Sequence, residues 1–307
     1  MKKPRSSRMS RCSGAAGARA EDASKQRQLL SFFFYQAVRD HKPVWMLEDM
    51  RTMETFHWEE RESQRSYTPS EALLYAIVHD HQPYAQYLLR NFSDGALAMP
   101  GESHCCCPSS APHLAMAVRY DRRNILTLIL QVTHQLPGFS SYMNRSGCFH
   151  AEDGKTPLHL ACELLRSEIV VLLLGNGASP HLRDHNDMTP LDIVLEQLGA
   201  SKVNAGPKKL CLESLLMFMP QVRFKMKDVL EKDPQCWSKV LGEETFQYLT
   251  GKVPAPLFLI AMQRILSQLP PKEFPHSLDK LPIPAALKPL PKAFRQQQKQ
   301  QQRYTLA

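Results

Sequence analysis

Cysteine and histidine side chains that could bind a metal gather around one segment of the chain. The candidate ligands are His104, Cys105, Cys106, Cys107, His113, Cys148 and His150. Zinc sites use four ligands in tetrahedral geometry, commonly with two residues between paired cysteines. Three adjacent cysteines point in different directions, so we expect no metal site. A reduced loop, zinc binding, and acylation or redox sensing of the thiols remain the alternative uses of this segment.

His159 and Cys162 have the residue types of a general base and a cysteine nucleophile. They lie three residues apart, a spacing that places both on one face of a helix. Both also stand in a helix-opening motif in which their side chains would be packed. The sequence contains no glycine-rich phosphate loop, no H-E-x-x-H metal motif and no nucleophile elbow. We therefore expect no catalytic residue, no cofactor and no enzymatic activity.

The helix-opening motif is TPLHLAC over Thr156 to Cys162, and a second Thr-Pro-Leu begins 33 residues later at Thr189. Threonine caps helices, and proline fits their first turn. Apolar residues at helical spacing predict a helix that reaches Leu165, followed by a second helix over 169–174. The motif and the period resemble those of the ankyrin-repeat family, with the clearest repeats over 156–188 and 189–220.

Weaker helix–turn–helix patterns precede these repeats over 34–50, 71–89 and 112–130. A small residue recurs at one position of each unit: Ala37, Ala76, Ala117, Ala161 and, in the last unit, Val194. A helix pair of this kind cannot bury its apolar face alone, so neighbours must stack on it. We expect an all-α ankyrin solenoid. The resemblance also implies a projecting finger, with a solvated loop as the alternative interpretation; the candidate client-binding residues are His181, Arg183, Asp184, His185 and Asn186.

The segment 255–291 follows the repeats and has a different pattern. Leu257, Ala261 and Ile265 form an apolar stripe on a predicted helix that is apolar on several sides and therefore needs a partner surface. Farther on, Leu281-Pro282-Ile283-Pro284 has two prolines, which hold the backbone extended. A second helix is predicted between them, over 274–280.

This order of elements resembles a SOCS box, the adaptor module that links receptors to elongins B and C and a cullin. The resemblance implies elongin binding by Pro256, Leu257, Ala261 and Ile265, although the family prefers cysteine at the position of Ala261. It implies cullin-5 or cullin-2 binding by Leu281, Pro282, Ile283 and Pro284.

The whole chain resembles ankyrin-repeat substrate receptors with a SOCS-box-like C-terminus. That resemblance implies a non-catalytic, cytoplasmic subunit of a cullin–RING E3 ubiquitin ligase, which promotes ubiquitination and proteasomal degradation of a client. It also suggests a metabolic enzyme such as IMP dehydrogenase as the client. An ankyrin scaffold without a ligase link is the alternative.

The net charge of +8 is concentrated at the two ends of the chain. Residues 1–28 hold eight basic and two acidic residues, residues 292–307 hold four basic and no acidic ones, and the remainder carries −2. We expect a disordered basic tail over 1–28 and a disordered Gln-rich tail over 292–307, with ankyrin repeats over 29–225 and a helical connector or cap over 226–254. Basic tails could bind nucleic acid or a membrane surface, but we expect neither a specific nucleic acid nor a membrane span or secretory signal.

Overall fold

The structure is a computed structural model, and it describes residues 33–52, 67–100, 111–136, 138–147, 153–201 and 203–290. The chain divides into two compact units, residues 1–67 and 68–307. All regular elements within the described ranges are helices, so the predicted all-α fold is confirmed. No helix in these ranges is long and apolar enough to cross a membrane.

The first unit contains a helix over 33–39 and helix α2 (Val44–Thr52). The buried ring of Phe34 stacks on Tyr67, with their centroids 4.7 Å apart. The guanidinium of Arg51 is buried, pairs with Glu48 and donates to the carbonyl oxygen of Tyr67 at 2.9 Å. Aromatic stacking therefore joins the helix over 33–39 to Tyr67, and a paired, hydrogen-bonded charge joins the end of α2 to Tyr67.

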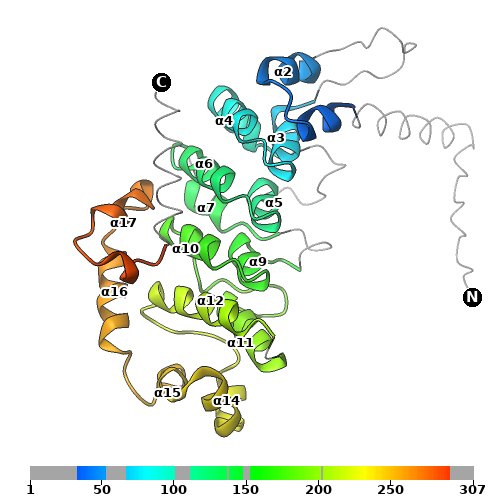
Figure 1. The fold of residues 1–307 in the computed structure, drawn as a ribbon. Coiled ribbons are helices and arrows are strands. Elements are labelled where there is room, and N and C mark those ends of the chain that lie inside the picture. The colour runs from blue at the N-terminus through cyan, green and yellow to red at the C-terminus, as the bar shows by residue number, and fades with distance from the viewer. Residues whose placement is uncertain are drawn as a thin grey trace, which may run out of the picture. The chain divides into compact units, whose positions relative to one another are not determined.

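The second unit begins with four helix pairs (Figure 1). The pairs are α3 (Pro69–Val78) with α4 (Gln82–Leu97), α5 (Pro112–Arg119) with α6 (Arg123–Thr133), α9 (Pro157–Glu163) with α10 (Ser167–Gly175), and α11 (Pro190–Ala200) with α12 (Ala205–Met217). The first helices α3, α5, α9 and α11 contact one another in that order, while α4 contacts α6 and α10 contacts α12. The leucine, isoleucine and valine side chains between these layers are buried and form the core.

The recurring alanines stand at the same backbone turn in successive ankyrin repeats. The carbonyl oxygens of Ala76, Ala117 and Ala161 each accept a hydrogen bond from the backbone N–H five residues later, at 2.9 Å in all three cases. The residue just before that donor has a positive φ angle, as at Leu165 (φ 57°). A left-handed residue ends a helix. Helix α9 therefore ends at Glu163, and our expectation that it reaches Leu165 was wrong.

Threonine caps open three of the first helices. Thr68, Thr156 and Thr189 are the N-cap residues of α3, α9 and α11, and each forms a reciprocal capping box with the residue three positions later. That residue is Glu71, His159 or Asp192. All three can accept from the N-cap backbone N–H, which explains how different residue types serve at the same position.

Helix α7 (Phe139–Met143) lies between α6 and α9 in the chain, and α13 (Lys227–Lys232), α14 (Pro234–Leu241) and α15 (Glu243–Thr250) follow the stack. The C-terminal part comprises α16 (Leu257–Ser267), the 3-10 helix η1 (Pro271–Glu273), α17 (His276–Lys280) and the 3-10 helix η2 (Ala285–Leu287). Helix α16 packs against α12, and this part runs along the side of the stack formed by the second helices (Figure 1). The second helix expected over 274–280 is thus shorter: Phe274 has extended backbone (φ −75°, ψ 135°), Pro275 is the N-cap residue, and the helix begins at His276.

Candidate protein-interaction surfaces

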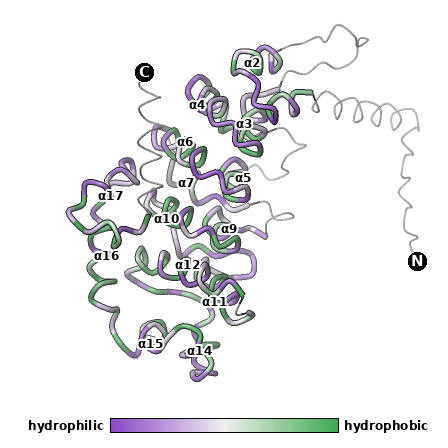
Figure 2. The backbone as a smooth tube through the Cα atoms, viewed as in Figure 1, coloured by the Kyte–Doolittle hydropathy of each residue, from purple (hydrophilic) through white to green (hydrophobic). Residues whose placement is uncertain are grey.

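The N-terminal half of α16 exposes apolar side chains. Leu257 is 83% exposed, Phe258 50% and Ile260 46%. Ala261 is also exposed, Ile265 is half-buried, and Pro256 is the half-buried N-cap residue. The helix is mainly hydrophobic along its length (Figure 2). The residues proposed from sequence for elongin binding thus lie together on one helix, with Leu257 and Ala261 facing away from the rest of the unit.

The opposite face of α16 fixes this helix to the repeats. Met262 and Leu266 are buried. The side-chain amide of Gln263 donates to the carbonyl oxygens of Leu216 and Met219, at 2.8 and 3.0 Å. Carbonyl groups at the end of a helix lack intrahelical partners, so Gln263 satisfies the end of α12. This role of Gln263 was not predicted from the sequence, although a glutamine within an apolar helix could have indicated such a cap.

Phe274 anchors the segment after α16. Its buried ring lies over Gly175 at the end of α10 and meets the ring of Phe218 edge-on, with centroids 6.4 Å apart and an interplanar angle of 75°. Near this point His134 contacts Asn176 through a 2.8 Å hydrogen bond. Burial lowers the pKa of His134, and the positive charge of Lys272 adds to this shift. The C-terminal segment therefore crosses the ends of α6, α10 and α12.

The candidate cullin-binding residues follow α17 in extended backbone. Leu281 has φ −68° and ψ 130°, and Pro284 has φ −51° and ψ 141°. Pro282 and Pro284 are exposed, whereas Leu281 and Ile283 are half-buried. The Nζ of Lys288 donates to the carbonyl oxygen of Asp279 at 3.2 Å, which ties η2 back to α17. The segment thus presents an alternation of exposed prolines and partly accessible aliphatic side chains.

The predicted finger is an ordered turn between α10 and α11. His181, Arg183, His185 and Asn186 are exposed, but Asp184 is buried. The Asp184 carboxylate accepts from the backbone N–H groups of Asn186 and Met188, at 2.8 and 2.9 Å. Asp184 therefore shapes the finger and is not accessible to a client. Burial lowers the pKa of His181, and the charge of Arg223 adds to this effect.

The cysteine and histidine candidates divide between described and undescribed positions. His104, Cys105, Cys106, Cys107, Cys148 and His150 lie outside the described residues. His113 is buried, and its Nε2 lies 3.0 Å from the carbonyl oxygen of Ser70. The described ranges contain no group of three or more metal-ligating side chains.

His159 and Cys162 are both engaged in packing the repeat. The Nδ1 of His159 accepts from the Thr156 hydroxyl at 2.7 Å, and its Nε2–H donates to the carbonyl oxygen of Met188 at 3.0 Å. Burial lowers the pKa of His159 and raises that of the Cys162 thiol well above its usual value. A reactive cysteine needs a lowered pKa and access to solvent, so this pair has the wrong environment for nucleophilic catalysis.

Comparison with known proteins agrees with the observed stack. Residues 153–185 match the Ankyrin repeat family model. Ankyrin repeat domain-containing protein 9 of Mus musculus is 43% identical over 305 residues, which cover 90% of this chain and 93% of the mouse protein. Human NF-kappa-B inhibitor alpha is 39% identical over 70 residues, covering 23% of this chain and 21% of that protein.

Another partial match is the BTB/POZ domain and ankyrin repeat-containing protein NBCL of Lupinus angustifolius, 34% identical over 70 residues, or 20% of this chain and 14% of that protein. Stacked ankyrin repeats are binding surfaces for other proteins, typically without catalytic activity. Because the similarity to the mouse protein spans nearly all of both sequences, the chain belongs to the ankyrin-repeat family of ankyrin repeat domain-containing protein 9.

Proposed function

We propose that this chain is the non-catalytic substrate-recognition subunit of a cullin–RING E3 ubiquitin ligase in the cytoplasm. In this proposal the ankyrin repeats bind a client protein, while residues 255–291 bind elongins B and C and cullin-5 or cullin-2. Holding the client beside the ligase raises the effective concentration of its lysines at the ubiquitin-conjugating enzyme. The modified client is then degraded by the proteasome.

The exposed leucine at the start of α16 carries this proposal. Leu257 is 83% exposed, and Phe258 and Ile260 extend the same apolar surface. Burying a leucine side chain contributes about 1.5–3 kcal/mol, which a partner protein can gain on binding. Because Met262, Gln263 and Leu266 hold the helix against α12, little ordering entropy is lost on association. Elongins B and C are the partners that the SOCS-box pattern implies.

The extended segment after α17 is the proposed cullin contact. Pro282 and Pro284 limit the conformations of Leu281 and Ile283 before binding. Buried Phe274 sets the position of this segment, so both partner surfaces are fixed to the same repeat stack.

The finger between α10 and α11 is the proposed client contact. His181, Arg183, His185 and Asn186 expose polar groups, while Asp184 holds the turn. The Nζ of Lys225 donates to the carbonyl oxygen of Asn186 at 2.9 Å, which further orders the finger. A metabolic enzyme such as IMP dehydrogenase is the proposed client, on the resemblance noted for the sequence.

Co-purification with elongins and cullin tests the proposal. We expect the full chain to retain elongins B and C, and the Leu257→Asp variant to lose them. Val203→Asp is the matched control, because Val203 is 70% exposed but lies far along the chain from α16. A Leu281→Ala, Pro282→Ala variant should keep the elongins and lose the cullin.

Failure of the unmodified chain to retain elongins would sink the ligase proposal. That outcome favours the alternative, an ankyrin-repeat scaffold whose C-terminal helices only cover the stack. Under the alternative, Leu257→Asp and Val203→Asp behave alike, and a client is bound without becoming ubiquitinated. Cellular ubiquitination of the client with and without Leu257→Asp separates these two functions.

A further inference from the structure

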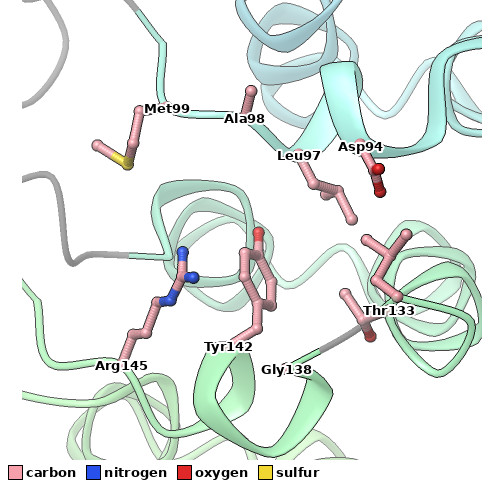
Figure 3. A pocket seen from close by; sticks show the side chains of 9 residues that line it. Asp94, Leu97, Ala98, Met99, Thr133, Gly138, Tyr142 and Arg145 are labelled. Carbon is pink, nitrogen blue, oxygen red and sulfur yellow. The ribbon is translucent and has the colours of Figure 1, made fainter.

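A pocket of about 300 Å³ lies between the C-terminal end of α4, the end of α6 and the short helix α7 (Figure 3). Its volume is at the lower end of ligand pockets, which hold roughly 300–1,000 Å³. Leu97, Ala98, Met99 and Leu136 contribute apolar parts of its lining. None of its lining residues belongs to α16, α17 or the finger, so it is separate from the surfaces of the proposed ligase function.

The hydroxyl of Tyr142 is a buried polar group in this pocket. The side chain is only 7% exposed, and its oxygen has no hydrogen-bond partner among the described residues. Figure 3 shows the ring rising from α7 with its hydroxyl inside the pocket. Burial raises the pKa of Tyr142, so the hydroxyl keeps its proton and can donate it. Unpaired buried hydroxyls are unfavourable, so an acceptor entering the pocket would relieve this cost.

Arg145 supplies a positive charge next to the hydroxyl. Its guanidinium carbon lies 5.2 Å from the centroid of the Tyr142 ring. Figure 3 shows the guanidinium beside that ring, at the same pocket. Within the described ranges the Arg145 guanidinium stacks on this ring and forms no ion pair with a carboxylate. A guanidinium and a hydroxyl together offer donors that suit an anionic oxygen group.

We propose that this pocket binds a monocarboxylate with a short apolar body. The carboxylate accepts hydrogen bonds from the Tyr142 hydroxyl and the Arg145 guanidinium. The apolar body lies against Leu97 and Leu136.

The carboxylate of Asp94 also lines the pocket and opposes a second negative charge, which disfavours a phosphate dianion. The same chemistry is offered by a free short-chain acid and by the C-terminal residue of a peptide.

Ligand-observed NMR and thermal unfolding of the full chain test the proposal with hexanoate, its neutral analogue hexanamide, and inorganic phosphate. We expect saturable hexanoate binding, and binding of hexanamide and phosphate at least about tenfold weaker, since a hydrogen bond to a charged group is worth about 1.5–3 kcal/mol. Tyr142→Phe keeps the ring and should weaken hexanoate binding about tenfold. Arg145→Gln should weaken it by at least as much.

Arg264→Gln is the control for loss of positive charge, because Arg264 is exposed on α16 and is not among the residues that line the pocket. It should leave hexanoate binding unchanged. Unfolding of each variant without ligand checks that the fold is retained.

A tripeptide ending in leucine, with a free or an amidated C-terminus, identifies the source of the carboxylate. Tighter binding of the free peptide acid than of hexanoate supports the peptide source, and the reverse supports a free acid. The proposal is overturned if hexanoate fails to bind, if hexanamide binds equally, or if both Tyr142→Phe and Arg145→Gln retain the original affinity.

Discussion

The ring of Phe274 lies directly against Gly175, at a distance that leaves no space for a side chain on the glycine. A Cβ built on Gly175 would stand 2.3 Å from the ring carbons of Phe274. Gly175 is the last residue of α10, and Phe274 follows η1 in the C-terminal segment. One contact between residues far apart in the chain therefore brings the proposed cullin-binding segment against the repeat stack.

Replacement of Gly175 by alanine should destabilise the protein. In an unobstructed helix this change gains roughly 0.5–1 kcal/mol, because alanine loses less backbone entropy than glycine. Here the new methyl group must displace Phe274, and overpacking of this kind costs about 1–3 kcal/mol. We expect a net loss in the free energy of unfolding, measured by urea denaturation.

Gly206→Ala is the matched control, because Gly206 lies in α12 and a Cβ there meets no atom within 4 Å. That variant should be neutral or more stable. In a Phe274→Ala background, Gly175→Ala should also lose its penalty. Equal stabilisation by Gly175→Ala and Gly206→Ala would show that Phe274 does not pack on α10.

The repeat register was predictable because it depends on local chemistry. Thr-Pro at a helix start is a short-range signal, and it placed Thr156 and Thr189 correctly at the starts of α9 and α11. Val194 was aligned with the alanines, but α11 continues past it to Ala200 without the left-handed turn. The last unit therefore differs where its sequence already departed from the pattern.

Long-range contacts were not predictable in this way. Nothing near Phe274 in sequence indicates that its partner is Gly175, and the burial of Asp184 follows from the turn that it closes. The pocket at Tyr142 joins three helices through residues that match no motif. Such features depend on tertiary packing, for which periodicity gives no signal.

Acidification should destabilise the fold through its buried histidines. Burial lowers the pKa of His159 below the value of about 6.5 expected in the unfolded chain. At a pH between the folded and the unfolded pKa, the unfolded state therefore binds more protons than the folded state. The contribution of His159 to the free energy of unfolding is complete above about pH 6.5 and falls as the pH is lowered. The fall is at most about 1.4 kcal/mol per pH unit for each such histidine.

Urea unfolding at pH 7.5 and 5.5 measures this effect. The His159→Asn variant should be less stable at the higher pH, because Met188 and Thr156 lose their partner, but its stability should change less on acidification. An unchanged pH dependence in that variant would contradict the assignment to His159.

Asp192 should be a strong determinant of stability at the end of the stack. Its buried carboxylate accepts from the N–H and hydroxyl of Thr189, and from the backbone N–H groups of Lys225 and Met226 at 3.0 and 2.8 Å. In Asp192→Asn, the side-chain NH₂ group faces N–H or hydroxyl groups that also donate, so those groups lose their acceptor. We expect the free energy of unfolding, measured in urea, to fall by about 2–4 kcal/mol. Asp228→Asn, at an exposed position on α13, is the control and should change stability by less than about 0.5 kcal/mol. Similar effects from both variants would refute the role assigned to Asp192.

Leu165 should be replaceable by asparagine with a gain in stability. It has φ 57°, while Asp80 and Asp121 stand at the matching turns, each with φ 55°. Left-handed backbone costs a bulky residue about 1–2 kcal/mol, and asparagine tolerates it better. Because the Leu165 side chain is half-buried, part of the gain is offset by lost packing, so we expect Leu165→Asn to add about 0.5–1 kcal/mol to the free energy of unfolding. Asp80→Leu makes the reverse change and should be destabilising. If Leu165→Asn is instead less stable, side-chain packing outweighs backbone strain at this turn.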